Sequence, residues 1–123
     1  MNTTQQRAVS IGELKDWILS NRRGCAFKDY TAHRIICQIT SAANNNTIAY
    51  VLDTNQQLCG VGIGHLVGDT LFFVDDVLIT QKSSLKILVE WLKQQYPKRT
   101  IIGLRHMKSV HIFNNPNKLL KYL

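Results

Sequence analysis

The fold is decided by residues 70–105, whose sequence is TLFFVDDVLITQKSSLKILVEWLKQQYPKRTIIGLR. Its first part, Thr70–Ile79, is rich in Val, Phe and Ile, which favour a strand. Apolar residues then recur at helical spacing over Ser83–Gln95, and this helix should end before Pro97, because the residue that precedes a proline avoids helical geometry. Thr100–Arg105 returns to a strand pattern. This order predicts a right-handed βαβ unit with two parallel strands.

The segments on either side of this unit complete the predicted element order. Ser10 and Glu13 have the spacing of a capping box, in which each side chain bonds a free backbone N–H of the first helical turn. Periodicity predicts helices over 11–21 and 32–43, and strands over 47–52, 58–67 and 110–113. Three consecutive strands then form an antiparallel meander. We therefore expect an α+β fold with a mixed, mostly antiparallel sheet and helices on both faces.

Length and composition indicate one intracellular domain. With 123 residues, of which 45% are hydrophobic and 19% charged, the chain has room for a single core over residues 1–123. No apolar run approaches the roughly 18–20 residues that span a bilayer, and residues 1–9 show no secretory signal, so we expect a cytoplasmic location. The cysteines, 25, 37 and 59, and the four histidines have no zinc spacing, and we expect no metal site.

The charge is distributed unevenly along the chain. Residues 1–80 hold six Lys/Arg and seven Asp/Glu, a net charge of −1, whereas residues 81–123 hold nine Lys/Arg and one Glu, a net charge of +8. This asymmetry suggests an anionic partner, which could be a phosphate-bearing cofactor, a nucleic acid or an acidic protein. A basic surface that is solvated and has no dedicated ligand is the alternative.

Glycines occupy alternate positions of the second predicted strand. Gly60, Gly62 and Gly64 share one face, which therefore carries no side chains. Such a strip allows something to approach the backbone closely. Packing of a helix or an aromatic residue is one interpretation, and close approach of a ligand is the other.

Two carboxylates interrupt the apolar strand over 71–79. Alternation sends Asp75 and Asp76 to opposite faces, so we expect one of them to lie on a covered side, where it must be hydrogen-bonded, paired or raised in pKa. A carboxylate with a raised pKa in a cleft can act as a general base. The alternatives are an ion pair with Arg105 or Lys108, or an exposed strand edge.

The start of the helix that follows this strand could bind an anion. A helix N-terminus has free N–H groups and a positive dipole end, and Lys82, Ser83 and Ser84 add a cation and two hydroxyls. The alternative is simple N-capping by Ser83 or Thr80.

This layout resembles the core of the GNAT acyltransferases over about residues 10–106. Cys59-Gly60-Val61-Gly62-Ile63 is similar to a strand of the V-G-x-x kind in that family. Residues 71–79 and 85–92 resemble its acyl-CoA strand and helix. The resemblance implies a GNAT-like core that takes an acyl group from acetyl-CoA or another acyl-CoA and transfers it to an amine.

The chain departs from the family pattern at two points. Thr80-Gln81-Lys82-Ser83-Ser84 stands where the family has Q/R-x-x-G-x-G/A, and residues 107–123 form a truncated C-terminal part. Residues 68–75, GDTLFFVD, are similar to the G-D-x-L-x-F-x-D strand of the toxin-activating lysine acyltransferases, which are also shortened. The catalytic His of those enzymes has no match here. Short, degenerate GNAT-like proteins of bacteriophages are a further likeness.

Two functional hypotheses follow, one enzymatic and one not. In the first, Asp75 or Asp76 accepts the amine proton. The backbone N–H groups of Leu78, Thr80 and the turn of Lys82, Ser83 and Ser84 hold the thioester carbonyl and the pyrophosphate, and Gln81 belongs to the same cofactor site. In the second, the chain is a non-catalytic basic module, encoded for example by a phage or mobile element. It would contact nucleic acid or an acidic protein through Lys98, Arg99, Arg105, Lys108, Lys118 and Lys121.

Overall fold

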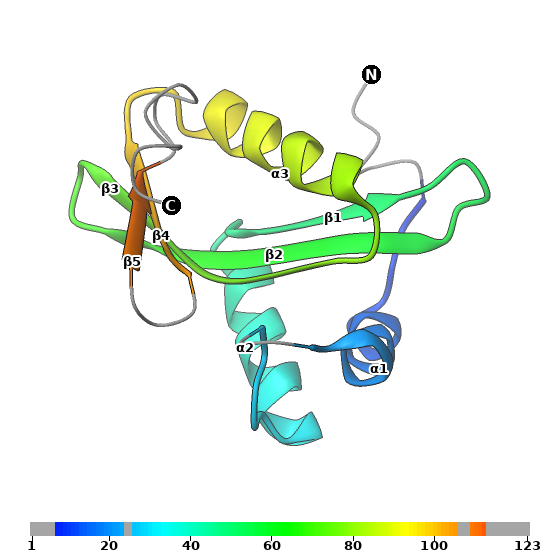
Figure 1. The fold of residues 1–123 in the computed structure, drawn as a ribbon. Coiled ribbons are helices and arrows are strands. Elements are labelled where there is room, and N and C mark those ends of the chain that lie inside the picture. Colours follow the sequence, from blue (N-terminus) through cyan, green and yellow to red (C-terminus); the bar gives the residue numbers. More distant parts are fainter. Residues whose placement is uncertain (1–6, 24–25, 106–108, 113–123) are drawn as a thin grey trace.

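The computed structural model describes residues 7–23, 26–105 and 109–112, and for residues 103–105 and 109–112 only the backbone (Figure 1). These residues form an α+β fold whose elements follow the order that the sequence predicts: α1 (Ile11–Asn21), α2 (Ala32–Asn44), β1 (Ile48–Leu52), β2 (Leu58–Val67), β3 (Leu71–Ile79), α3 (Lys82–Gln95), β4 (Thr100–Arg105) and β5 (Ser109–Ile112).

The strands lie in one sheet in the order in which they occur in the chain. β1, β2 and β3 pair antiparallel as the predicted meander, β3 and β4 pair parallel, and β4 and β5 pair antiparallel. The prediction of a mixed, mostly antiparallel sheet is therefore confirmed.

Helices cover both faces of this sheet (Figure 1). α1 and α2 pack on one face, where Ile18, Ile35 and Ile39 join Val61 and Ile63 of β2 in a buried cluster. α3 packs on the other face, where Leu88 and Trp91 meet Ala49 and Val51 of β1. Since successive strand residues point to opposite faces, Val61 and Ile63 of β2 fill the first layer and the glycines of β2 face α3. Cys59 does not follow this alternation: the β1–β2 register shifts beside it, and its side chain joins the α3 layer.

The glycine strip is explained by packing at two of its three positions. A Cβ placed on Gly60 would lie 2.9 Å from the Cβ of Ser84, which is itself fully buried, and one placed on Gly64 would collide with the backbone of Phe73 and the ring of Phe72. At Gly62 the nearest atom, a methyl group of Leu88, would be 3.8 Å away. Packing therefore accounts for Gly60 and Gly64, where the first turn of α3 and an aromatic ring occupy the space, but it does not require a glycine at position 62.

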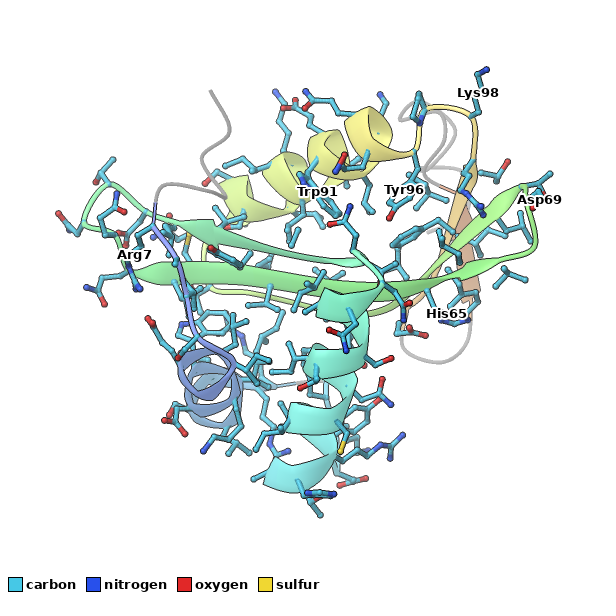
Figure 2. All side chains as sticks on the ribbon, turned by 180° about the vertical axis from the view of Figure 1, so that it is seen from behind. Arg7, His65, Asp69, Trp91, Tyr96 and Lys98 are labelled. Atoms are coloured by element: carbon cyan, nitrogen blue, oxygen red, sulfur yellow. The ribbon has the colours of Figure 1, made fainter. Side chains whose placement is uncertain are left out.

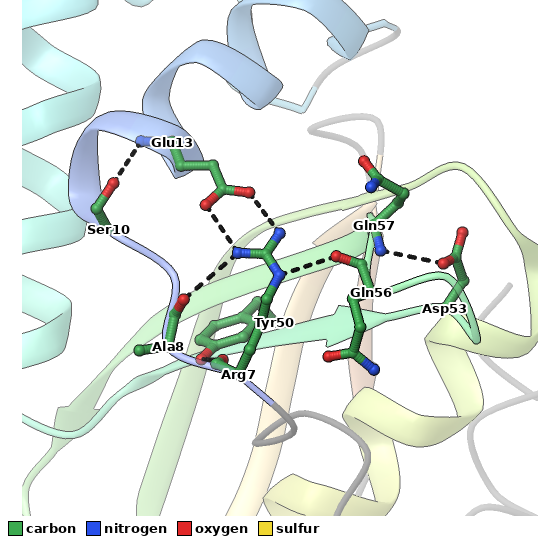
Figure 3. Close-up of polar contacts among 8 residues, drawn as sticks. All are labelled: Arg7, Ala8, Ser10, Glu13, Tyr50, Asp53, Gln56 and Gln57. Atoms are coloured by element: carbon green, nitrogen blue, oxygen red, sulfur yellow. Dashed lines mark hydrogen bonds and ion pairs between the residues drawn. The ribbon is translucent and has the colours of Figure 1, made fainter.

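The N-terminal segment is fixed to the sheet by Arg7 (Figure 3). Ser10 caps α1 as expected, because its Oγ accepts from the N–H of Glu13 at 3.0 Å. The Glu13 carboxylate does not complete the capping box, and instead accepts from both terminal nitrogens of Arg7 at 2.9 and 2.6 Å. Arg7 Nε donates to the carbonyl of Gln56, and the Tyr50 hydroxyl donates to the carbonyl of Arg7. These contacts tie the start of α1 to β1 and to the turn after it.

Candidate functional site

A β-bulge in β3 determines how the two adjacent carboxylates are placed. Ile63 pairs with Asp76 and Gly64 pairs with Val74, so Asp75 is an extra residue without a Cα partner on β2. An extra residue interrupts the alternation of side chains. The expectation that Asp75 and Asp76 point to opposite faces is therefore wrong: both lie on the face covered by α1 and α2.

Asp76 is tied to the segment between α1 and α2. Its Oδ1 accepts from the backbone N–H of Phe27 at 2.9 Å, and its Oδ2 accepts from the Tyr30 hydroxyl at 3.2 Å. Burial raises the pKa of Asp76 in spite of these bonds. The expectation of a covered, hydrogen-bonded carboxylate is confirmed for this residue. The side chains of Arg105 and Lys108, the other partners considered, lie outside the described part of the chain, so that alternative stays a prediction.

Asp75 forms a pair with His65 of β2. The distance between His65 Nδ1 and Asp75 Oδ2 is 2.8 Å, and the two side chains are 55% and 30% exposed. Because a carboxylate only accepts hydrogen bonds, Nδ1 carries the proton, and in the neutral ring Nε2 has the free lone pair. Figure 2 shows His65 on the α2 side of the sheet.

Sequence reasoning missed His65, which looked like one of four scattered histidines. The signal was the register of the β2–β3 hairpin. His65 pairs with Phe73. Asp75 lies two residues after Phe73 and is therefore the diagonal neighbour of His65 on the same face. Diagonal neighbours across a strand pair are within reach of long side chains.

The His65–Asp75 pair lines a polar groove of about 390 Å³ between the sheet and α2. Four polar residues of α2 and its C-cap form one wall, at a spacing that places them on one helical face: Arg34, Gln38, Ser41 and Asn45. The remaining lining comes from Tyr30, Ala42, Thr47, Ile63, Gly64, His65 and Asp75. Asp75, one of the two carboxylates expected to serve as a base, therefore borders a groove whose volume is sufficient for a small molecule.

β3 and β4 separate at the position of the bulge. Their parallel pairing covers only Leu71–Val74 on β3 and Thr100–Gly103 on β4, so from Asp75 onward the described residues give this edge of β3 no strand partner. We call this unpaired edge of β3, from Asp75 to Ile79, the fork. Asp75 is the first residue of β3 beyond the last pair.

The amides that face the fork differ from those expected. The N–H of Thr80 donates to the carbonyl of Cys59 on β2 at 2.9 Å. Because main-chain groups alternate between the two edges of a strand, Leu78 also faces β2, whereas Val77 and Ile79 face the fork. The carbonyl of Ile79 accepts from Arg23 Nη2 at 3.0 Å, in agreement with this assignment.

The start of α3 has no side-chain cap. Gln81 is the N-cap residue and makes no capping bond, while the Thr80 hydroxyl donates to the carbonyl of Cys59. The alternative of capping by Ser83 or Thr80 is therefore wrong. Gln81, Lys82 and Ser83 are exposed. Ser84 is buried and donates to Cys59 Sγ at 3.3 Å, so its hydroxyl belongs to the core.

The expected nucleic-acid contacts are located only in part. Lys98 is exposed. The Arg99 guanidinium donates to the carbonyls of Gly68 and Leu71 at 3.0 and 2.7 Å, so it holds the β2–β3 hairpin against the start of β4. The side chain of Arg105 and all of Lys108, Lys118 and Lys121 lie outside the described residues, and their role stays a prediction.

No protein-family model matches the sequence, and comparisons with curated proteins and with solved structures give no match. The GNAT-like assignment therefore stays a prediction. Across the described residues, no helix is long and apolar enough to cross a membrane. The same residues include no group of three His, Cys, Asp or Glu side chains that could hold a metal ion.

Proposed function

We propose that this chain is a shortened GNAT-like N-acyltransferase in which His65 and Asp75 act together as the general base. The observation that carries the proposal is the position of this pair, which borders a polar groove at the residue where β3 parts from β4. Acyl transfer to an amine requires a proton acceptor beside a space that can admit the amine, and the position of the pair at the groove supports this role.

His65 performs the proton transfer in this scheme. An alkyl amine is protonated at neutral pH and must lose a proton before it can attack. His65 Nε2 takes that proton, and Asp75 stabilises the imidazolium through Nδ1. An acyl thioester supplies the electrophilic carbonyl. His65 releases this first proton to water. As the C–N bond forms, the nitrogen loses a second proton, which His65 takes and passes to the thiolate that leaves as the C–S bond breaks. Asp76 is bound to Phe27 and Tyr30, so we assign it a positioning role.

The fork and the start of α3 suit the acyl donor. The N–H groups of Val77 and Ile79 face the fork and could bind the thioester arm. Exposed Lys82 and Ser83, beside a helix N-terminus without a side-chain cap, suit a pyrophosphate. This is the anion site that the sequence predicts, without the glycines of the family loop.

Calorimetric titration with acetyl-CoA tests the donor site. We expect binding to the wild-type protein that weakens in K82E, because this change reverses the charge beside the phosphates, and that persists in D69N. Asp69 is an exposed acid at the β2–β3 turn, away from the fork, and D69N is the control. The absence of binding heat up to about 1 mM acetyl-CoA would remove the proposal.

A second candidate is a basic module that binds nucleic acid or an acidic protein. Exposed Lys82 and Lys86 on α3 and Lys98 after it favour this function. Lys contacts with phosphates predict binding that weakens steeply with salt. A gel shift at low ionic strength tests it, and the absence of salt-sensitive binding excludes nucleic acid. For either function we place the chain in the cytoplasm.

A further inference from the structure

Arg34 lines the groove and forms no close ion pair within the described residues, although the charge of Asp76 acts on it from a distance. The ion pairs of the described residues join Arg7 to Glu13, Lys15 to Asp16 and His65 to Asp75, and none of them involves Arg34. Its guanidinium carbon lies 3.9 Å from the centroid of the Tyr30 ring. A guanidinium stacked on an aromatic ring keeps the edges of its fork free for a planar anion.

The ring that carries Arg34 is itself held in place. The Tyr30 hydroxyl donates to Asp76, and the ring meets Phe27 edge to face, with centroids 5.8 Å apart. Phe27 is fully buried, so the Tyr30 ring packs against a fixed part of the core. The Arg34 guanidinium therefore stacks on a ring that is itself held by hydrogen bonding and packing. This stacking lowers the conformational entropy that the Arg34 side chain loses when it binds a ligand.

The groove thus contains two groups of opposite character. Arg34 contributes a cation with free donors, and His65–Asp75 contributes a carboxylate and a ring nitrogen that can accept a proton. Gln38 and Ser41 supply polar groups on the same face of α2 as Arg34. A volume of about 390 Å³ lies within the usual range for small-molecule sites.

We propose that the groove binds a small zwitterion, an amine that also carries a carboxylate, with the carboxylate on Arg34 and the amine at His65–Asp75. This inference rests on the proposed acyl transfer, in which the groove is the acceptor site. It defines the acceptor as a free molecule that resembles an amino acid. A lysine side chain in a protein is excluded, since it has an amine but no adjacent carboxylate for Arg34.

The test measures binding rather than activity. The free amino acids are screened against the full chain by calorimetry and by the NMR shifts of the His65 ring. The tightest binder is then compared with its carboxamide, which lacks the negative charge, and with its N-acetyl derivative, which lacks the ammonium. We expect each derivative to bind about ten- to a hundredfold more weakly, as for loss of a charged hydrogen bond.

The variant R34Q tests whether Arg34 is the group that binds the carboxylate of the ligand. In R34Q the acid and its carboxamide should bind with equal affinity. K28Q, which removes an exposed charge from the segment just before α2, should bind like the wild type. Circular dichroism checks that both variants fold. Equal affinity of acid and carboxamide in the wild type, or no binder at about 10 mM, overturns the inference.

The outcomes separate this inference from the proposed function. If acetyl-CoA binds and no zwitterion does, the acceptor class is wrong and acyl transfer stands. If a zwitterion binds through Arg34 and acetyl-CoA does not, the groove is a binding site and the transferase proposal fails.

Discussion

Asp75 and Asp76 are consecutive residues of β3, and yet their carboxylates lie on the same face of the sheet. The bulge opposite Ile63 and Gly64 produces this arrangement. It gives the two acids separate tasks within a few ångströms of one another. Asp76 is buried and holds the segment between α1 and α2, whereas Asp75 reaches the groove and orients His65.

Replacing either member of the His65–Asp75 pair should abolish most of the acyl transfer. We expect H65A and D75N to lower kcat by about 10²- to 10⁴-fold, the usual contribution of a general base and its orienting partner. Thiol release from acetyl-CoA in the presence of the acceptor measures the rate.

The same variants should leave the proposed donor site intact, because the pair lines the groove and not the start of α3. The affinity for acetyl-CoA should therefore match that of the wild type. Transfer at the wild-type rate in H65A would assign the base to another residue, and D69N again serves as the matched acid-to-amide control.

The raised pKa of Asp76 makes folding stability depend on pH. Burial favours the protonated form in the folded state, so stability from this group is fully present below the unfolded pKa and declines as pH rises through the folded value. D76N keeps an acceptor for Phe27 and a partner for Tyr30 and should lose this decline. Urea midpoints across the acid range measure it, and a D76N profile parallel to the wild-type profile would contradict the assignment.

Glu13 should contribute a pH dependence of the opposite sign. Its hydrogen bonds to Arg7 lower the pKa of the Glu13 carboxyl, so the associated stability is present above the unfolded pKa and is lost as pH falls through the folded one. The pair is largely exposed, so the effect should be small and screened by salt. E13Q should flatten the acid end of the stability profile at low ionic strength and change little in high salt.

The close approach of α3 to β2 predicts different costs for two neighbouring glycines. G60A should destabilise the fold by about 1–3 kcal/mol, because its methyl group would meet the Cβ of Ser84 in the core. G62A places a methyl group in ordinary contact with Leu88 and should change stability much less. Chemical denaturation compares them. Adding S84G should recover part of the loss in G60A, and equal losses in the two single variants would show that packing against Ser84 is not the cause.

The helices and strands could be predicted from local sequence patterns, but the set of residues that forms the site could not. Periods of two and 3.6 and the position of Pro97 predict every helix and strand that the structure describes. The bulge at Asp75 leaves no trace in composition, since it depends on how two strands pair. His65, Tyr30 and Arg34 come together only through that pairing and the packing of α2. Polar residues 34, 38, 41 and 45 could have been noticed as one helical face, but nothing local says that a cavity lies beside them.

Asp75 is an extra residue in β3, so a deletion of this one residue could change the chemistry of the groove without changing the architecture of the fold. Without Asp75, Val74, Asp76 and Val77 would align with Gly64, Ile63 and Gly62 in an uninterrupted ladder, and both valines would keep facing α3. Such a shortened chain would retain its layers, and the one remaining carboxylate, Asp76, would already be bound to Phe27 and Tyr30. A lineage carrying this scaffold could therefore lose or regain the histidine–aspartate pair by a single in-frame deletion or insertion, with the rest of the molecule unchanged.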